Sequence, residues 1–580
     1  MTREAADRLS IAVSIAAALL FAAIGWNSSR DLETLWDEAV DHDIAVDLMR
    51  HPIAGSAPTL DASQMRLPMY VCAAVFGVTG RDDLKTARCI SLVVGAVTII
   101  ATGALARACF GPMAAGLAVV LLALSPYFIS FGRISMTEGD VFFACFSTLA
   151  LWALVRHLHA PSPRTWLLTG LLLACAVGSK LFAIFLIPVS GVMMLAAGAR
   201  PAREAAEKSP DTLWLYRLLA LQLAVLVATA GLAWFSRTAA VFGWLALAAL
   251  WCMSIRGALR SRVDAAGPWP RFLSLTAFAL VSCCVLMPVH ITDHQIAREI
   301  LRRLLRWDNS FPLALWDDHL RLYAGILLVK LTVPLGIVTC IALVFAAFRE
   351  RDDGRWRACV LSFVFYVVII CLLPLRQTFY LMGVYPAIIV LTAALSVEIH
   401  RWLRARSARA APAWVVVVVT MVCHLGWRAR SEFPWYHLYG YDTVGDRWLG
   451  AESRGYRNLI QTPSDGVESL VRWCTDGGKV KRGDRVVSYL WEERIIRGVM
   501  PAEPHFIFVP RGVTPDSATV PPAPSIDSAD FVLLHINNLL GYGDLPPDWP
   551  PPELLAARFE VVHSVRRGRL AVGWVYARRD

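Results

Sequence analysis

The sequence is poor in charge for its length. Only 18% of its 580 residues are Asp, Glu, Lys or Arg, whereas about 25% is usual in a soluble domain. Apolar residues (AVILMFWYC) make up 56% of the chain, and the mean hydropathy is +0.51. This balance excludes a disordered chain, a collagen-like fibre and an ordinary soluble enzyme.

Several short motifs are also lacking. The 13 cysteines form no C-x-x-C pair and lie mostly in apolar runs, so neither a zinc ribbon nor a disulfide framework is indicated. Neither a P-loop nor a G-x-G-x-x-G occurs, which leaves no signature for a nucleotide-bound donor. No clear A-x-A cleavage site follows the first apolar run, so we expect that run to be a retained first span.

Long apolar runs dominate what is present. Runs of about 17–25 residues fit the hydrocarbon core of a bilayer, and they predict an α-helical polytopic membrane protein with about 13 transmembrane helices. The predicted spans are residues 9–26, 88–108, 112–130, 140–157, 165–180, 182–198, 213–233, 238–256, 271–288, 322–347, 358–374, 379–397 and 412–427.

The net charge of +10 indicates topology rather than nucleic-acid binding, because the basic residues lie in loops between the apolar runs. The loops that fall on one side are rich in Arg and Lys, and the positive-inside rule makes that side cytoplasmic. We therefore expect a cytoplasmic N-terminus and an extracytoplasmic C-terminus. The loop 289–321 lies outside in this scheme and carries Arg298, Arg302, Arg303 and Arg306, so it departs from the rule.

Residues 428–580 are predicted to be a separate extracytoplasmic domain beside a transmembrane catalytic domain of residues 1–427. Short β-branched and aromatic runs alternate there with loops, and a helix-like stretch covers residues 465–474, which is typical of a small α/β domain. The expected strands are residues 485–490, 505–509, 530–536, 559–565 and 570–576.

Residues 27–87 form a predicted outer loop with interfacial helices. Trp36, Val40, Ile44 and Leu48 recur every four residues, which predicts a helix with one apolar stripe. Its acidic residues either face a cavity or form a solvated face, and the pattern leaves both readings open.

Four stretches, taken together, resemble the GT-C membrane glycosyltransferases, in particular the bacterial branch near the protein O-mannosyltransferases and the lipid A aminoarabinose transferase. The stretches are Trp36-Asp37-Glu38, Arg66-Leu67-Pro68-Met69-Tyr70, the segment from Ser125-Pro126 through Arg133 to Asp140, and the segment from Gly170 through Lys180 to Pro188. The run Arg376-Gln377-Thr378-Phe379-Tyr380 is also similar to a stretch of that family.

The resemblance implies transfer of a sugar from a polyprenyl-phosphate donor on the outer face of the bacterial cytoplasmic (inner) membrane, with inversion at the sugar. Asp37 is the candidate general base, with Glu38 beside it. The phosphate leaves as a stable anion, so positive charge matters more than a general acid. The candidate phosphate-binding residues are Arg66, Arg133, Lys180 and Arg376. The candidate substrate-binding residues are Glu138, Asp140, His290 and Tyr380.

The expected partners are a polyprenyl-phosphate-linked sugar, membrane lipids and a glycan, lipid or protein acceptor, without nucleic acid. No cofactor or metal site is assigned. A divalent metal stays an open alternative, because Asp41-His42-Asp43 has the D-x-D form and His290, Asp293 and His294 lie close in sequence. A transporter or flippase of a lipid-linked sugar is the main rival function, and a binding subunit without catalysis is a third.

Overall fold

The structure is a computed structural model, and it describes residues 2–30, 32, 36–53, 65–134, 140–198, 210–260, 268–293, 295–296, 298, 333–348, 378–407, 409–431, 433, 467–475, 479–481, 484–488, 506–508, 529–535, 552–567 and 570–579. The chain divides into two compact units. The first, which we call the helical unit, comprises residues 1–29 and 40–436, and the second, the sheet unit, comprises residues 30–39 and 437–580. The helix over residues 36–50 begins in the segment 30–39 and is described with the helical unit.

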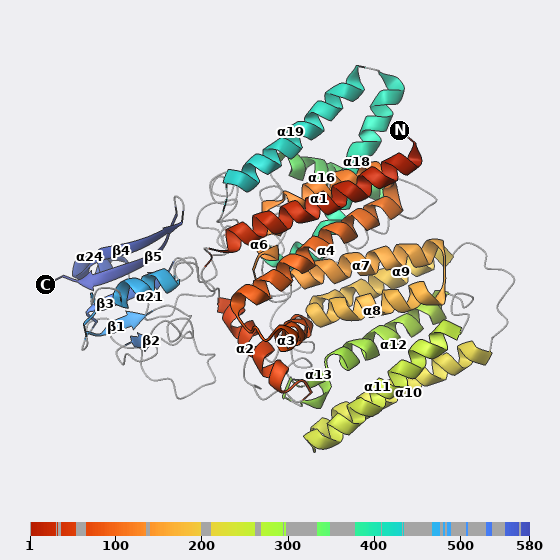
Figure 1. Ribbon diagram of the computed structural model, residues 1–580, viewed down its shortest axis with the longest axis horizontal. Coiled ribbons are helices and arrows are strands. Elements are labelled where there is room, and N and C mark those ends of the chain that lie inside the picture. The colour runs from red at the N-terminus through yellow and green to blue at the C-terminus, as the bar shows by residue number, and fades with distance from the viewer. Residues whose placement is uncertain are drawn as a thin grey trace. The chain divides into compact units, whose positions relative to one another are not determined.

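The helical unit is built from long apolar helices (Figure 1). Its described helices are α1 (Arg3–Ser29), α2 (Trp36–Arg50), α3 (Leu67–Thr79), α4 (Leu84–Phe110), α5 (Pro112–Ala123), α6 (Pro126–Gly132), α7 (Asp140–His159), α8 (Pro163–Ser179), η2 (Leu181–Phe185), α9 (Leu186–Gly198), α10 (Pro210–Ala233), α11 (Arg237–Arg260), α12 (Pro268–Leu286), α13 (Val289–Thr292), α16 (Val333–Phe348), η6 (Thr378–Gly383), α18 (Tyr385–Arg406) and α19 (Ala410–Ser431).

Eight of these helices are long and apolar enough to cross a membrane, or nine if α5 and α6 count together, within the described part of the chain. Each span predicted from the sequence overlaps at least one described helix, except 358–374, which lies outside the described residues. Of the predicted span 322–347, only residues 333–347 are described. The predicted class of helical polytopic membrane protein is thereby confirmed, while the number 13 stays a prediction.

The predicted span 112–130 is not straight. It is broken into α5 and α6, which are bent by 65°. Pro126 starts α6, and a proline disfavours the helical conformation of the residue before it. Ser125 accordingly has an extended backbone (ψ 115°), and its hydroxyl caps α6 by accepting the Phe128 backbone N–H at 3.3 Å.

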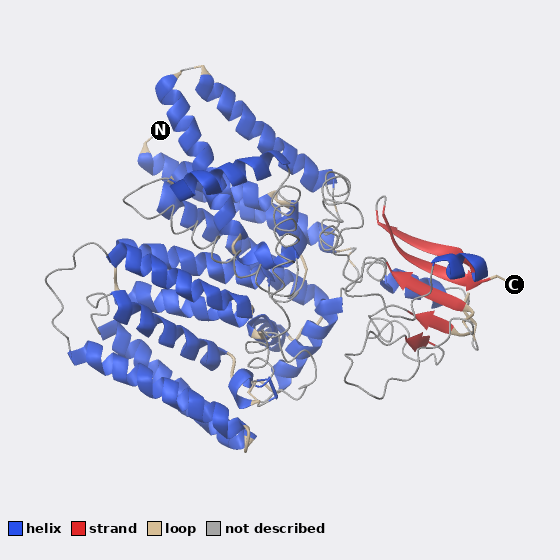
Figure 2. Cartoon of the chain, turned by 180° about the vertical axis from the view of Figure 1, so that it is seen from behind, coloured by secondary structure: helices blue, strands red, loops and turns tan. Residues whose placement is uncertain are grey.

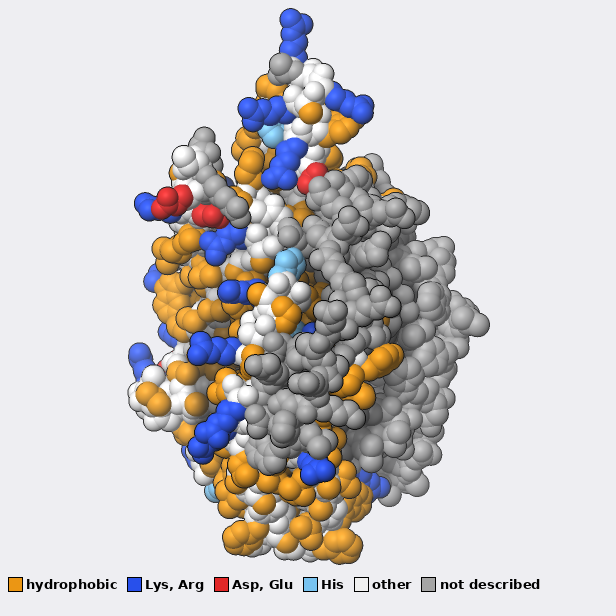
Figure 3. Space-filling model, turned by 90° about the vertical axis from the view of Figure 1, so that its right-hand side faces the viewer, with side chains coloured by type: hydrophobic (Ala, Val, Ile, Leu, Met, Phe, Trp, Pro, Cys, Tyr) orange, Lys and Arg blue, Asp and Glu red, His pale blue; other side chains and the backbone are white. Residues whose placement is uncertain are grey.

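Successive spans run in opposite directions, so that their ends gather on two sides. We call the side at which α1 and α8 end and α4 and α7 begin the site end. The opposite end carries Arg107, Arg156, Arg164, Arg404 and Arg406 near helix termini. Figure 3 views the molecule from the side where α1 begins, and Lys and Arg side chains are scattered over the described surface there.

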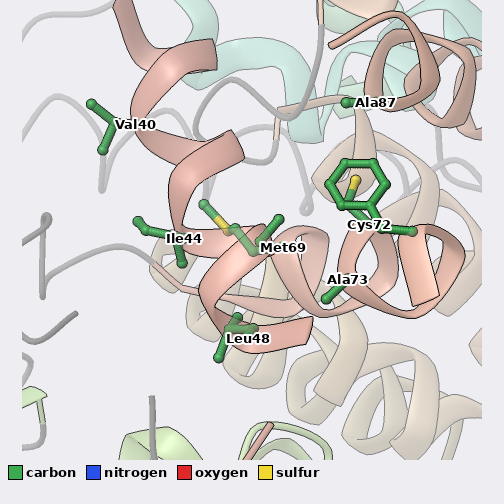
Figure 4. Close-up of a cluster of buried hydrophobic side chains, with 9 residues drawn as sticks. Val40, Ile44, Leu48, Met69, Cys72, Ala73 and Ala87 are labelled. Atoms are coloured by element: carbon green, nitrogen blue, oxygen red, sulfur yellow. The ribbon is translucent and has the colours of Figure 1, made fainter. Parts of the chain in front are cut away.

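The predicted helix 36–50 is confirmed as α2, and its apolar stripe packs on α3 at the site end. Val40, Ile44 and Leu48 are buried together with residues of α3 such as Met69 and Phe76 (Figure 4). The stripe therefore holds the polar helix α2 against an apolar helix of only 13 residues.

The sheet unit contains a five-stranded sheet with the order β2-β1-β3-β5-β4 (Figure 2). The strands are β1 (Val486–Ser488), β2 (Phe506–Phe508), β3 (Phe531–His535), β4 (Phe559–Arg567) and β5 (Leu570–Arg578), and the helices are α21 (Val467–Thr475) and α24 (Pro552–Arg558). β1 pairs in parallel with β2 and β3, whereas β5 is antiparallel to β3 and β4.

All five strands and α21 lie where the sequence predicted them. α21 packs Leu470 and Val471 on Leu533 and Val575 of the sheet. The sequence-based boundary at residue 427 falls inside α19, which continues to Ser431.

Candidate functional site

Arg66 lies directly before α3 and is almost fully buried. One helical turn on, the Tyr70 hydroxyl donates to the carbonyl oxygen of Pro52 at 2.9 Å and accepts the backbone N–H of Val289 at 3.4 Å. Burial raises the pKa of Tyr70 far above its usual value, so the hydroxyl keeps its proton. The site end thus places a buried guanidinium at the point where α3 meets α13.

Two more buried arginines donate hydrogen bonds to carbonyl oxygens in the last turn of α1. Arg133 donates to the carbonyl oxygen of Ser28 at 3.0 Å, and Arg88 donates to that of Ser29 at 3.2 Å. The last carbonyls of a helix have no partner within it and carry a partial negative charge, which a guanidinium stabilises. Arg133 therefore has a structural role at the end of α1 besides the phosphate contact that the sequence suggested for it.

Asp140 and Lys180 form a buried ion pair, although the sequence assigned them separate roles. The Lys180 ammonium lies 2.5 Å from the Asp140 carboxylate, and the two side chains are 7% and 2% exposed. Asp140 begins α7, and Lys180 directly follows the last residue of α8. Because these antiparallel helices pack side by side, both charges come to the site end together.

Lys180 accordingly presents less net positive charge than a lysine without a carboxylate beside it. A phosphate at this position would meet a nearly neutral pair, whose two charges cancel at a distance. The predicted roles of Lys180 in phosphate binding and of Asp140 in substrate binding stay predictions.

The acidic residues of α2 differ in their surroundings. Glu38 and Asp41 are fully buried, whereas the Asp43 side chain is 56% exposed. Asp41 lies near Cys72 of α3, whose pKa is raised by burial and by the Asp41 charge. The backbone of Asp37 lies in the first turn of α2, while its side chain is outside the part of the chain that the structure describes.

His42 joins α2 to the segment before α4. Its Nε2 lies within hydrogen-bond distance of the carbonyl oxygen of Asp82, and its Nδ1 is 3.9 Å from Asp43. The contact with Asp43 is the main cause of a raised His42 pKa, and burial acts against it. His42 also contacts the Phe76 ring, with centroids 5.7 Å apart.

α13 brings a further predicted residue to the site end. His290 lies on this single helical turn and is buried. The α8 end lies close by, since a Cβ built on Gly178 would be 2.9 Å from the Met287 methyl group. Asp293 follows α13 and pairs with Arg237, the first residue of α11.

The other candidates from the sequence fall partly or wholly outside the described residues. Glu138 and Arg376 are not described, and only the backbone of Tyr380 is, within η6. The start of α18, next to η6, is fixed by a 2.6 Å hydrogen bond between the hydroxyls of Tyr385 and Ser125.

The described residues contain no group of three or more His, Cys, Asp or Glu side chains suited to a metal ion. Asp41 and Asp43 do not act as one D-x-D chelate, because two residues span about 200° of a helix, and one is buried while the other is exposed. Asp293 pairs with Arg237, and His294 is not described.

Sequence reasoning named Tyr70 only as part of a motif, gave Arg88 no role, and did not pair Arg237 with Asp293. A signal existed for two of them. Arg88 is a charge at the start of an otherwise apolar run. Arg237 and Asp293 both lie next to the ends of predicted spans, on the same side of the membrane. The Tyr70 contacts join residues far apart in the chain, which no local pattern reveals.

Residues 66–224 match the family model described as dolichyl-phosphate-mannose-protein mannosyltransferase. The match confirms, for this segment, the resemblance to the GT-C membrane glycosyltransferases. It includes Arg66, Arg133, Asp140 and Lys180. The comparison with curated proteins found no match.

Solved structures of low similarity were also found. The oligosaccharyltransferase of Archaeoglobus fulgidus in the apo form is 14% identical, over 91% of this chain and 69% of that one, with a TM-score of 0.48. ArnT from Cupriavidus metallidurans bound to undecaprenyl phosphate is 13% identical, over 98% of this chain and 97% of that one, with a TM-score of 0.34. Because both TM-scores lie below 0.5, neither likeness supports a function for this chain.

Proposed function

We propose that the protein is an inverting glycosyltransferase that moves a sugar from a polyprenyl-phosphate donor to an acceptor hydroxyl. The observation that carries this proposal is the set of buried charges at the site end, five of which (Arg66, Arg88, Arg133, Asp140 and Lys180) lie in the segment matched to the mannosyltransferase family. Ionisable residues inside a membrane protein are costly, and a functional role is the default reading of them. The name of the matched family contains a lipid-phosphate sugar, which is the donor class proposed here.

The acceptor oxygen attacks C1 of the sugar from the side opposite the phosphate, so the anomeric centre inverts. The C1–oxygen bond to the phosphate breaks, and the lipid phosphate leaves with the bonding electrons. Asp37 takes the proton from the acceptor hydroxyl, with Glu38 next to it on α2. General-base catalysis of this kind contributes roughly 10²–10⁴ in rate.

Arg66 is our first candidate for the leaving phosphate. It is buried, and a guanidinium keeps its charge and binds phosphate through two N–H groups. Arg133 already donates a hydrogen bond to the Ser28 carbonyl oxygen of α1, and Lys180 already forms an ion pair with Asp140. We therefore assign these two a supporting role and keep Arg376 as a further candidate.

The site end lies opposite the arginine-rich helix termini, and the positive-inside rule makes the arginine-rich end cytoplasmic. We propose that transfer takes place on the outer face of the bacterial inner membrane, and that residues 428–580 form an extracytoplasmic domain that shapes acceptor binding. A reporter fused after Asp580 that is active only in the cytoplasm would refute this orientation.

The proposal is tested by transfer from a radiolabelled polyprenyl-phosphate sugar in proteoliposomes, with membranes of a strain lacking the protein as the acceptor source. We expect Asp37→Asn to lower transfer by about 10²–10⁴ while the protein stays folded. Asp43→Asn is the matched control on the same helix, because its side chain is exposed, and it should transfer normally.

Normal transfer by Asp37→Asn would refute the base assignment. Movement of the labelled lipid across the bilayer without any transfer would instead support the rival flippase function.

A further inference from the structure

A concave surface lies at the site end, next to α13. It is a pocket of about 370 Å³ at the turn between α10 and α11, which also takes in the residues after α13. Its lining includes Trp234, Phe235, Arg237, Asp293 and Gln295. In Figure 1 this turn lies at the same end of the helical unit as α2, α3 and α13.

The turn that forms one wall is held by its own hydrogen bonds. The Ser236 backbone N–H donates to the carbonyl oxygen of Leu232 at 2.8 Å. The Ser236 hydroxyl in turn caps α11 by accepting the Ala239 backbone N–H at 3.3 Å. The wall is therefore a tight helix-to-helix turn whose backbone is held by hydrogen bonds.

The opposite wall is fixed by Asp293. Its carboxylate pairs with Arg237 and also accepts the backbone N–H groups of Gln295 at 2.9 Å and Ile296 at 3.4 Å. Asp293 is 4% exposed, whereas 47% of the Arg237 side chain stays exposed. A guanidinium anchored in this way is pre-oriented toward the pocket.

Aromatic surface stands next to this ion pair. Trp234 is 55% exposed and Phe235 is 90% exposed. A planar apolar face beside fixed polar donors and acceptors suits a ring with an apolar face and hydroxyls at its edge. The charge of Arg237 is offset by the buried carboxylate of Asp293, so the pocket has little excess attraction for an anion such as phosphate.

We propose that this pocket binds an uncharged sugar ring of the acceptor, which stacks on Trp234 and receives hydrogen bonds from Arg237. The proposal rests on the proposed function, since it names a glycan as the acceptor class. α13 links the pocket to the candidate site, because the Val289 backbone N–H donates to Tyr70 and Thr292 lines the pocket. α13 is four residues long, or about 6 Å, and it joins Met287 at the α8 end to Asp293 in the pocket.

The first experiment measures binding without transfer. Saturation-transfer difference NMR with a panel of neutral methyl glycosides is recorded on the purified full-length protein in nanodiscs. We expect at least one glycoside to bind, Trp234→Ala to weaken it about tenfold, and Trp234→Phe to keep most of the affinity. Trp269→Ala is the matched control, because Trp269 is a 58% exposed tryptophan at the start of α12.

The second experiment uses the transfer reaction. Trp234→Ala should raise the KM for the acceptor about tenfold, with kcat and the KM for the lipid donor unchanged. Arg237→Lys keeps the charge opposite Asp293 but loses the planar fork, and it should raise the same KM by a smaller factor.

The outcomes separate the two proposals. Glycoside binding that needs Trp234, in a protein that transfers no sugar, would support the pocket and refute the proposed function. Transfer with an unchanged acceptor KM in Trp234→Ala would refute the pocket alone. A pocket that responds only to the lipid composition of the nanodisc, and to no glycoside, would identify it as a lipid contact and overturn the proposal.

Discussion

Two of the ion pairs described at the site end, Lys180 with Asp140 and Arg237 with Asp293, differ in their surroundings. Lys180 and Asp140 are both buried, between α7 and α8. Arg237 is about half exposed against a buried Asp293, at the rim of a pocket. Burial therefore decides whether a charge supports the packing of helices or is available to a ligand. An enclosed pair stabilises only as long as both members are present, while a pair at a rim keeps one member in contact with solvent.

The largest effect is expected from breaking the enclosed pair. Lys180→Met leaves the Asp140 carboxylate buried without its ammonium, which typically costs about 3–5 kcal/mol. We expect a clear fall in the thermal unfolding midpoint of the purified protein, together with a loss of transfer. Lys85→Met is the matched control, since Lys85 is exposed at the start of α4, at the same end.

The double variant Lys180→Met/Asp140→Asn separates stability from catalysis. Removing both charges avoids the isolated carboxylate, so a good part of the lost stability should return. If the midpoint returns while transfer stays low, the pair acts in the reaction as well. An unchanged midpoint in Lys180→Met would contradict the pairing itself.

The sequence predicted much of the framework because apolar length and β-branched runs are local signals. The spans, the helix 36–50, and the five strands all follow from such runs. The break between α5 and α6 also has a local signal, the dipeptide Ser125-Pro126. The sequence prediction overlooked it because residues 112–130 form one continuous apolar run.

The site was predicted less well, because its contacts join distant residues. Arg133 and Ser28 are 105 residues apart in the chain. The pairing of Asp140 with Lys180 follows from antiparallel spans sharing an end, and the sequence-based topology already contained that fact. How deeply Arg66 and Asp41 are buried depends on the packing of α2 on α3, which no spacing rule gives.

A smaller effect is expected at the rim pair. Arg237→Met removes the half-exposed member, and Asp293 keeps two backbone N–H groups as hydrogen-bond donors. We expect a loss of about 1 kcal/mol in the free energy of unfolding, measured by the same thermal unfolding experiment. A loss of unfolding free energy as large as that of Lys180→Met would show that Arg237 and Asp293 depend on each other as strongly as Lys180 and Asp140 do. Burial would then not distinguish the two pairs.

The smallest effect is expected at His42, whose partners are partly exposed. Its pKa is raised, chiefly by Asp43, so the folded state binds the proton more tightly than the unfolded chain does. The resulting stabilisation is fully present below the unfolded pKa of about 6.5, and it is lost as the pH rises through the raised value. The groups that face His42 are Asp43, the Asp82 carbonyl and the Phe76 ring.

His42→Gln keeps an amide N–H for the Asp82 carbonyl but does not titrate, so it isolates the proton-linked part of the contact. The unfolding midpoint of the natural protein should exceed that of His42→Gln by more at pH 5.5 than at pH 8.0, by about half a degree or less (~0.3 kcal/mol). His51→Gln is the matched control, because His51 is exposed just after α2 and should show no such difference. Equal midpoint differences at the two pH values would mean that neutral His42 stabilises α2 as well as protonated His42 does. The contact would then be a hydrogen bond to which the charge of His42 adds nothing.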